Sequence, residues 1–482
     1  MNRIILVLTA WLFWHQGHAQ IRVSDNHRFL STANGEPFFW LGDTDWEMAH
    51  RLNRDEAATL IHTRAQQGFN VLQVVALAEF NGIREPNRYG DWPLNNEDPT
   101  QLAVTPGSDP ADAYAYDYWD HLDYIIDLAE KEGIYIGLLP TWGDKVAHLW
   151  GDGPIVLRES NAEAYAGFVA RRFQHHKNIL WILGGDRPAV YEGSGAAAGK
   201  KFDDRIIWRA MASGIERVLG ADAFITYHPA GGSYSTSQFI HEDQWLDMNA
   251  FQSGHGSREV DAWNWVVRDH ALKPLKPTLD MEPCYEDHPV NPWDGKWTRQ
   301  RGYFHAHDVR ARIYRTVFAG GAGVTYGHHQ VWQFLNTIYH EPVNIGDTTI
   351  GWEVALHAEA ATQLKYLRNL VLSRPYFSRV FDPSMVSAGN GQTYVDYLAA
   401  MRDENGSYAM IYFPRNQPAT IDWKKLTGSK KTLWWYDPRT GTASRAGTFG
   451  GKGMKLTPPS AGDWVLVIDD AGKNYPAPGT LH

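Results

Sequence analysis

Eight apolar runs of strand length alternate with amphipathic, helix-length stretches between residue 38 and about residue 370. A buried parallel strand reads as a continuous apolar run, and its parallel neighbour is reached through a crossover that is usually a helix. Eight such repeats predict an α/β fold of the (β/α)8, or TIM-barrel, type. The expected strands are Phe38–Leu41, Val71–Leu77, Tyr135–Leu139, Ile179–Leu183, Phe224–Tyr227, Met248–Gln252, Thr278–Met281 and Gly323–Tyr326.

Helices are expected between these strands. Asn53-Arg-Asp-Glu56 has the form of a capping box, in which side chains satisfy the first free N–H groups of a helix. The long connection from Glu79 to Asp117 is rich in Asn, Pro and Asp, and in a barrel such an insertion shapes the cleft. The expected helices include Arg54–Gln67, Tyr118–Glu132, Ala162–Phe173, Asp203–Leu219, Asp308–Phe318 and Glu353–Leu370.

The pattern changes after Pro375. Short runs of alternating polarity are separated there by Gly, Asn, Asp and Pro, which predicts a small antiparallel β-sandwich of roughly one hundred residues. No linker-like tract separates it from the barrel, so we expect the two to pack directly. The expected domains are the barrel, residues 20–374, and the sandwich, residues 375–482. Its expected strands include Thr393–Tyr397, Tyr408–Tyr412, Thr432–Tyr436 and Trp464–Ile468.

The first 19 residues have the parts of a secretory signal peptide. A basic start at Arg3 is followed by an apolar stretch from Ile4 to Trp14 and by small residues before Gln20. The apolar stretch is too short to cross a bilayer, and no later segment reaches that length. We therefore expect residues 1–19 to be cleaved and the protein to be exported to the periplasm, the cell surface or the medium.

Composition narrows the classes of partner. The formal net charge is −10 and no basic cluster is present, which argues against nucleic acid and against anionic membranes. The single cysteine, Cys284, allows no intramolecular disulfide, so stability must come from a large core. The 21 Trp and 23 Tyr residues include several in polar loops, where exposed rings can stack on sugars, although a large core buries many aromatic rings anyway. We expect a monomer without a cofactor.

Two strand ends carry a carboxylate followed at once by a proline or by Arg-Pro. The run from Ile179 ends in Asp186, and the run from Pro277 ends in Glu282. Active sites of (β/α)8 barrels lie at the C-terminal strand ends, so the two acids are expected to face one another across the barrel mouth. Each acid could instead cap the next helix or pair with an arginine. As a pair, they suit a retaining glycosidase, with Asp186 as acid/base and Glu282 as nucleophile about 5–5.5 Å away.

The remaining strand ends are polar or aromatic, and together they predict a polar cleft that binds a substrate. Taken singly, a strand-end histidine is more often a structural hydrogen-bonding residue than a catalytic one. The candidate substrate-binding residues are Asp43, Glu79, Trp142, Lys145, Arg187, His228, Gln252, His255, Tyr326, His328 and Trp332.

Other reactions lack their motifs. The sequence has no His-Glu-x-x-His and no Cys/His cluster, so we predict no metal. The patterns closest to a metal site are His305-x-His307 and the His-His pairs at His175 and at His328. The segment Gly193–Lys200 resembles a phosphate-binding loop but lacks the Ser or Thr after its lysine. Cys284 has no evident base and is expected to be a small buried residue.

Six motifs in order resemble the apiosidase-like glycoside hydrolases, family 140, over residues 22 to 372, and the C-terminal part resembles the collagen-binding-type domain that usually follows. The resemblance implies hydrolysis of the apiose–galacturonate linkage in the plant cell-wall pectin rhamnogalacturonan II, with Asp186 and Glu282 in the places of the catalytic pair. The motifs are Gly42-Asp-Thr, Gly184-Gly-Asp-Arg187, Thr226-Tyr-His-Pro, Gln252-Ser-Gly-His, Glu282-Pro-Cys-Tyr-Glu286 and Thr325-Tyr-Gly-His-His329.

One position departs from the broader class of retaining barrels. They carry Asn before the acid, where this chain has Gly185, so another side chain must hold the sugar 2-OH. For a galacturonate leaving group, Lys145 and Arg187 are the cations nearest in sequence, although Arg187 could equally orient a carboxylate. Two other functions stay open: another furanosidase, such as an arabinofuranosidase, and a non-catalytic glycan-binding protein.

Overall fold

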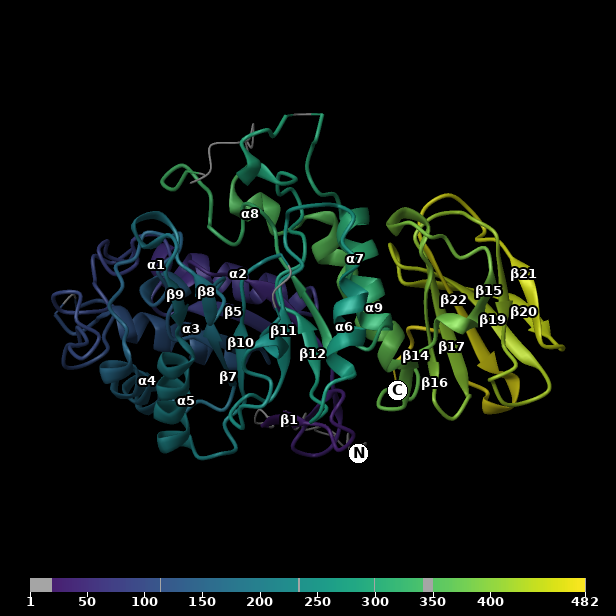
Figure 1. Cartoon of the computed structure of the whole chain (residues 1–482), viewed down its shortest axis with the longest axis horizontal. Helices are drawn as coiled ribbons and strands as arrows, with labels where there is room; N and C mark the ends of the chain where they lie inside the picture. Colours follow the sequence, from purple (N-terminus) through teal and green to yellow (C-terminus); the bar gives the residue numbers. More distant parts are fainter. Residues whose placement is uncertain (1–19, 113, 233–234, 299, 341–349, 482) are drawn as a thin grey trace, which may run out of the picture.

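The computed structural model describes residues 20–481 except 113, 233–234, 299 and 341–349. The predicted signal peptide, residues 1–19, lies outside the described residues. Figure 1 shows a helix-covered barrel on one side and a β-sheet domain on the other. No helix in the described part of the chain is long and apolar enough to cross a membrane.

The barrel contains the eight predicted parallel strands. Six of them form one sheet in the order β10-β7-β6-β5-β4-β13, and β11 pairs with β12. A bridge from Thr226 to Met248 joins β10 to the β11 side, and the Ala322 N–H bonds to the Thr278 carbonyl at 2.9 Å on the other side. The barrel prediction is thus confirmed. The strands are β4 (Trp40–Thr44), β5 (Val71–Val75), β6 (Tyr135–Leu139), β7 (Ile179–Gly184), β10 (Ile225–His228), β11 (Asn249–Phe251), β12 (Thr278–Asp280) and β13 (Gly323–Tyr326).

Helices cover the outside of this sheet. The capping box predicted at Asn53 and Glu56 is present, and Asp117 and Asp120 form a second one. Between β10 and β11 the described residues contain only a 3-10 turn, Thr236–Gln238, where a regular barrel would carry a helix. The helices are α1 (Met48–Arg51), α2 (Arg54–Gln66), α3 (Tyr118–Lys131), α4 (Glu159–Phe173), α5 (Arg205–Leu219), α6 (Ala262–His270), α7 (Ala306–Phe318), α8 (Trp352–Ala355) and α9 (Glu359–Leu372).

Small sheets close one end of the barrel and extend one loop. Ile21, Leu30 and Phe38 of the N-terminal sheet are buried in one apolar cluster with Tyr135 at the start of β6. This sheet therefore covers the N-terminal strand ends and leaves the opposite face open. The N-terminal sheet comprises β1 (Ile21–Val23), β2 (Leu30–Thr32) and β3 (Pro37–Phe38), and a hairpin after β7 comprises β8 (Val190–Glu192) and β9 (Lys201–Asp203).

The C-terminal domain has the predicted antiparallel sheets. One sheet has the order β14-β16-β17-β22-β19-β20 and the other β15-β18-β21. The strand expected over Thr393–Tyr397 is wrong, because Tyr394–Asp396 forms a 3-10 turn. The strands are β14 (Arg379–Phe381), β15 (Val386–Ala388), β16 (Ala399–Asp403), β17 (Tyr408–Phe413), β18 (Ala419–Asp422), β19 (Lys431–Asp437), β20 (Thr442–Phe449), β21 (Gly453–Leu456) and β22 (Trp464–Asp470).

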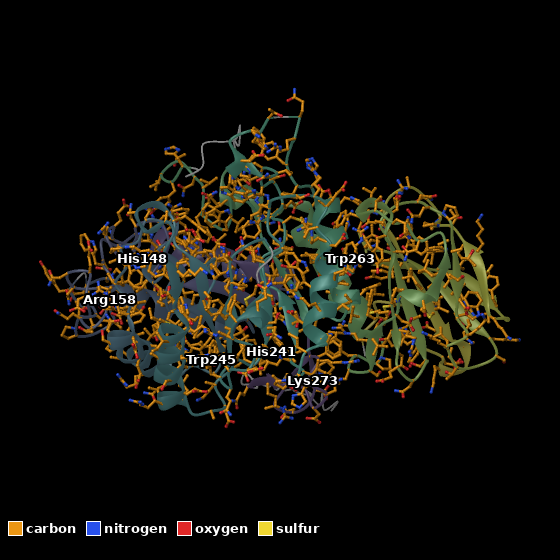
Figure 2. The ribbon with its side chains drawn as sticks, in the orientation of Figure 1. His148, Arg158, His241, Trp245, Trp263 and Lys273 are labelled. Carbon is orange, nitrogen blue, oxygen red and sulfur yellow. The ribbon has the colours of Figure 1, made fainter. Side chains whose placement is uncertain are left out.

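The sandwich packs directly on the barrel through α7 and α9. Arg310 of α7 holds Asp463 with two hydrogen bonds of 2.9 Å, and both side chains are buried. The ring of Trp263, labelled at the junction in Figure 2, stacks on Tyr397 with centroids 4.4 Å apart. Apolar side chains from both domains form one continuous core. This packing holds the two domains together. The sandwich contributes no side chain to the cavity described next.

Candidate active site

A cavity of about 820 Å³ opens at the C-terminal ends of the barrel strands. This size lies within the range of small-molecule and cofactor sites. Its walls are rich in aromatic rings, and both predicted catalytic acids line it. Of the residues predicted from the sequence, seven line this cavity: Glu79, Trp142, Asp186, Gln252, His255, Glu282 and Trp332.

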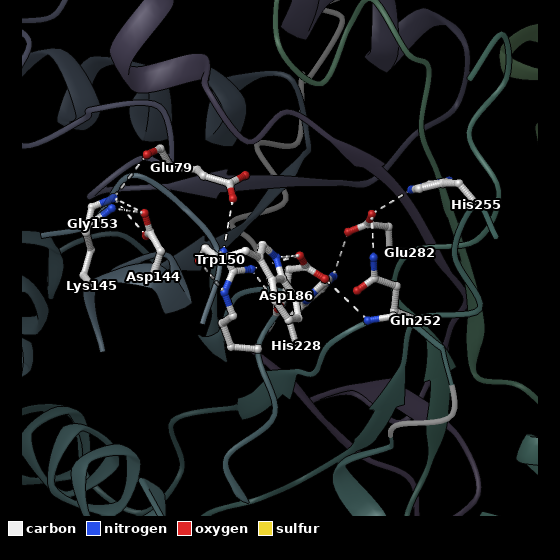
Figure 3. Close-up of polar contacts among 12 residues, drawn as sticks. Glu79, Asp144, Lys145, Trp150, Gly153, Asp186, His228, Gln252, His255 and Glu282 are labelled. Carbon is white, nitrogen blue, oxygen red and sulfur yellow. Dashed lines mark hydrogen bonds and ion pairs between the residues drawn. The ribbon is translucent and has the colours of Figure 1, made fainter. Parts of the chain in front are cut away.

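Glu282, two residues after β12, has polar partners at both carboxylate oxygens: Oε1 accepts hydrogen bonds, and Oε2 lies close to His228. Gln252 Nε2 and His255 Nε2 each lie 2.9 Å from Oε1, and His228 Nε2 lies 3.2 Å from Oε2 (Figure 3). Gln252 and His255 follow β11, the strand paired with β12, and His228 ends β10, the next strand around the barrel. The carboxylate is therefore fixed in orientation on three sides.

Backbone contacts set the proton positions on both histidines. His228 Nδ1 accepts the N–H of Asp186 at 3.1 Å, so the proton of the neutral ring is on Nε2, facing Glu282. His255 Nδ1 accepts the N–H of Tyr285 at 3.3 Å and likewise leaves Nε2 to donate. Burial works to raise the pKa of Glu282, but the hydrogen bonds from His228 and His255 outweigh it and lower the pKa to about 2. Glu282 is thus held as an anion.

Asp186 stands on a sharp turn after β7. Its φ is +51°, and Gly184 and Gly185 before it have φ of +87° and +106°. A Cβ on Gly185 would lie 2.9 Å from the Trp142 ring, and one on Gly184 would lie 2.3 Å from the His228 carbonyl oxygen. Only glycine allows this approach. The Gly-Gly pair therefore explains how the acid is brought beside Trp142 and His228.

The carboxyl group of Asp186 has one cation and two neutral donors around it. Arg187 Nη1 lies at 2.9 Å and Trp150 Nε1 at 3.0 Å from Oδ2, and the Gly231 N–H lies at 3.4 Å from Oδ1. Burial raises the pKa of Asp186, the Arg187 charge opposes this, and the negative charge of Glu282 raises it further. The net direction is upward, opposite to that of Glu282. Two carboxyl groups with pKa values driven apart suit a proton donor and an anionic nucleophile.

Arg187 has the structural role that the sequence left as one alternative. Its guanidinium is buried and bonds the Asp186 side chain, the Trp150 carbonyl at 2.6 Å and Glu79 Oε1 at 3.4 Å. It lies behind the cleft and orients the acid, as His228 does for Glu282. Arg187 contacts the Asp186 carboxyl group and His228 contacts that of Glu282, but neither residue lines the cavity.

Glu79 is a third acid in the cleft. Burial raises the pKa of Glu79, the Arg187 charge lowers it, and the charges of Asp144, Asp186 and Glu47 raise it, to about 8 in all. A pKa raised this far allows the Glu79 side chain to carry a proton near neutral pH and to donate a hydrogen bond into the cleft.

Lys145 does not reach the cleft. The prediction that it binds substrate there is therefore corrected. Its ammonium group is buried, lies 2.8 and 2.9 Å from the Asp144 carboxylate oxygens and bonds the Glu79 carbonyl at 3.2 Å. Lys145 is the last residue of a 3-10 turn, Gly143–Lys145, and its side chain points into the protein interior. A sequence does not reveal the direction of a side chain in such a turn.

Three further predicted residues lie away from the cavity. Asp43 is buried against Arg64 Nε at 2.5 Å, Tyr326 donates to Glu286 at 2.8 Å, and His328 Nε2 lies 3.4 Å from Asp287. All three are fully buried. Their place at the cleft is corrected: they belong to a polar layer that anchors the strand ends beneath it.

The sequence missed several residues of the cleft wall. Most come from loops, whose course cannot be predicted from strand and helix patterns. The Trp46 indole donates to Tyr285 at 2.9 Å, and the ring of His255 stacks on that of His288 with centroids 4.2 Å apart. The aromatic and histidine residues in this group are Trp46, Phe80, Trp150, Trp265, Tyr285, His288, Trp293 and His329.

Cys284 takes no part in the site. Its thiol is fully buried, and burial raises its pKa to about 12. A thiol that stays protonated is a poor nucleophile. The prediction of a buried residue is confirmed.

The chain is similar to known glycoside hydrolases over nearly its whole length. Residues 24–378 match a family described as "Apiosidase-like, catalytic domain", and residues 380–469 match "Putative collagen-binding domain of a collagenase". A crystal structure of a glycoside hydrolase family 5 protein from Bacteroides vulgatus ATCC 8482 has 32% identity, covers 96% of each chain and has a TM-score of 0.83. A second solved structure, a glycoside hydrolase, has 33% identity, covers 95% of this chain and 98% of its own, and has a TM-score of 0.82. No curated protein matches the chain.

Proposed function

Because the chain belongs to the apiosidase-like family of glycoside hydrolases, we propose that it removes terminal apiose from galacturonate in rhamnogalacturonan II. One observation carries the catalytic part of this proposal: Asp186 and Glu282 line the same cavity, with the pKa of the first raised and that of the second lowered to about 2. The apiose part rests on the family. Export, in keeping with the signal-like start of the sequence, completes the proposal.

The reaction proceeds in two steps with retention of configuration. Glu282 attacks the anomeric carbon while Asp186 gives its proton to the leaving oxygen. A glycosyl-enzyme ester forms on Glu282, and the aglycone departs. Asp186, now an anion, takes a proton from water, which attacks the same carbon and frees the sugar. Arg187 and Trp150, which contact Asp186, stabilise the charge that it carries between the steps.

Gln252 is the side chain that we propose to hold the sugar 2-OH in place of the missing Asn. One N–H of its amide bonds Glu282 Oε1 at 2.9 Å. This contact fixes the amide orientation, since a carboxylate accepts from the NH₂ group and repels the carbonyl oxygen. The second N–H then serves a hydroxyl on the carbon next to the reaction centre.

The aromatic wall favours a sugar substrate. Trp142 and Trp332 line the cavity from the ends of β6 and β13, and Trp293, with 59% of its surface exposed, stands at the rim. Rings of this kind stack on the apolar C–H faces of sugars. Lys145 is buried, so a cation for the galacturonate carboxylate has to come from elsewhere.

Digestion of rhamnogalacturonan II oligosaccharides tests the proposal. The full chain should release free apiose, and Glu282→Gln, which keeps the side-chain size, should release none. Release of a different pentose, such as arabinose, would show that the enzyme acts on another furanose and not on apiose. If the full chain binds the oligosaccharide but releases no sugar, the proposed glycosidase activity is refuted and the chain is a glycan-binding protein.

A further inference from the structure

A second cluster of reactive side chains lies on the outside of the barrel, between α3 and α4. Asp123 stands on α3, and His175 and His176 follow the end of α4 at Phe173. In Figure 1 these helices lie at the end of the molecule opposite the sandwich. None of the three residues lines the catalytic cavity.

The three side chains converge on one point. His176 Nε2 lies 3.0 Å and His175 Nε2 lies 3.4 Å from the same oxygen, Oδ1 of Asp123. One ligand atom from each residue lies within 4.8 Å of the others. In a tetrahedral site with metal–ligand bonds of about 2.0–2.2 Å, neighbouring ligand atoms lie about 3.3–3.6 Å apart. Small shifts of the side chains would therefore bring all three atoms to coordination distance of one ion.

We propose that Asp123, His175 and His176 bind a divalent transition-metal ion of the zinc class. Two imidazole nitrogens and one carboxylate oxygen form a ligand set that suits zinc, and they are less suited to calcium or magnesium, which prefer oxygen ligands. This proposed site departs from the expectation of no metal, in which the His175-His176 pair was one of three patterns that came closest to a metal site.

Glu130 supplies the outer contact that metal-binding histidines usually have. Its Oε2 lies 3.3 Å from Nδ1 of His176, whose ring is only 4% exposed. Both ring nitrogens of His176 contact carboxylate oxygens in the structure. When an ion replaces the proton on Nε2, the proton held on Nδ1 by Glu130 would leave Nε2 free to coordinate. Carboxylate–histidine–metal arrangements of this kind fix the ring and make the nitrogen more basic. Asp123 and Glu130 are seven residues apart on α3, two helical turns, and so share one face.

The remaining coordination position faces solvent. The His175 side chain is 59% exposed and that of Asp123 is 32% exposed, so an ion can enter without opening the fold. Water would complete the tetrahedron. The bound ion would link α3 to the segment that leads from α4 into β7, the strand that ends near Asp186, and it would stabilise the folded state because the unfolded chain lacks the site.

The alternative is a cluster of ion pairs with no affinity for metal. Without an ion, protonated histidines can pair with Asp123 and Glu130 directly, and Arg172 already pairs with Asp120 one turn away on the same helices. The two cases differ in zinc uptake, which an ion-pair cluster does not require.

Zinc titration of the full-length protein, after EDTA treatment and dialysis, distinguishes a metal site from a cluster of ion pairs. Isothermal calorimetry should show one zinc ion per chain, and thermal unfolding should move up on zinc addition and return with chelator. His175→Ala and Asp123→Asn should each lose this site. His62→Ala is the matched control, because His62 is 62% exposed and pairs with a single carboxylate, Glu132, at 3.4 Å. It should bind zinc as the parent does.

Cobalt(II) in place of zinc gives a second readout, since the intensity of its visible absorption reports tetrahedral coordination. The parent should show these bands, and His175→Ala should not. Unchanged zinc stoichiometry in His175→Ala would overturn the proposal, as would no uptake at millimolar zinc. Because His175 is exposed, His175→Ala should still fold, so the test stays valid even if Asp123→Asn unfolds. Sugar release plays no part in it, so its result is independent of the proposed glycosidase activity.

Discussion

The Nε2 atom of His228 lies 3.2 Å from Oε2 of Glu282, while Nδ1 of the same ring accepts the backbone N–H of Asp186 at 3.1 Å. One imidazole thus contacts the strand ends that carry both Asp186 and Glu282. The Asp186 backbone fixes the tautomer, and the tautomer provides a proton donor to Glu282. The position of one carboxyl group is coupled in this way to the ionisation of the other.

Removing a donor to Glu282 should shift the acidic limb of activity upward in pH. The pKa of Glu282 is about 2 because His228 and His255 donate to it against the effect of burial. In His228→Ala or His255→Ala this pKa rises, so the nucleophile becomes protonated at a higher pH and kcat/KM falls earlier on acidification. The pH profile of kcat/KM measures the shift. His241→Ala, which removes a buried histidine bonded to Asn249, should leave the acidic limb unchanged. Equal profiles for His228→Ala and the parent would contradict the assignment.

Asp186 should govern the basic limb, because it must be protonated to act as the acid and its pKa is raised by burial and by Glu282. Activity is therefore lost as pH rises through this pKa. In Asp186→Asn the limb should vanish, and the loss of kcat/KM should be far smaller on an aryl glycoside with a good leaving group than on the natural linkage. Equal losses on both substrates would remove Asp186 from the acid role.

Gln252→Ala should weaken recognition of the 2-OH. A neutral hydrogen bond is worth about 0.5–1.5 kcal/mol, so the preference for a 2-hydroxy over a 2-deoxy aryl glycoside should fall by roughly two- to tenfold. The comparison of the two substrates separates this effect from any disturbance of Glu282, which would slow both alike. An unchanged preference would assign the 2-OH to another residue.

Lys145→Ala should reduce stability and leave substrate preference alone. Its removal leaves the buried Asp144 carboxylate without its cation, and breaking a buried ion pair costs about 3–5 kcal/mol. Denaturant unfolding measures the loss, and the double variant Asp144→Asn with Lys145→Met should recover part of it. A stable Lys145→Ala protein with selective loss on uronate-linked substrates would restore the cleft role that the sequence suggested.

The sequence was sufficient for the barrel and for the two acids because both depend on local patterns. Apolar runs of strand length locate the strands, and an acid followed by Pro or by Arg-Pro marks Glu282 and Asp186 just after them. A position at the end of a strand did not determine the direction in which the side chain points. Lys145 and His328 follow strands and Asp43 lies near the end of β4, yet their side chains make buried polar contacts.

Loops account for the other differences. Trp150 donates to Asp186 at 3.0 Å from a loop 36 residues earlier in the chain, and no periodic signal relates the two positions. His288 and Trp293 likewise enter the cleft from the connection after β12. In the sandwich, Thr393–Tyr397 has strand composition, but the contacts of Tyr397 and Tyr394 with the barrel favour a tight turn.

The central claim is that Glu282 forms a covalent bond with apiose and that Asp186 assists it. It is tested most directly by NMR of a rhamnogalacturonan II oligosaccharide digest containing methanol, in which the acceptor reports both the sugar and its configuration. We predict methyl apioside with the configuration of the substrate linkage, and none with Glu282→Gln. A methyl glycoside of another sugar, or the inverted anomer, would contradict the account.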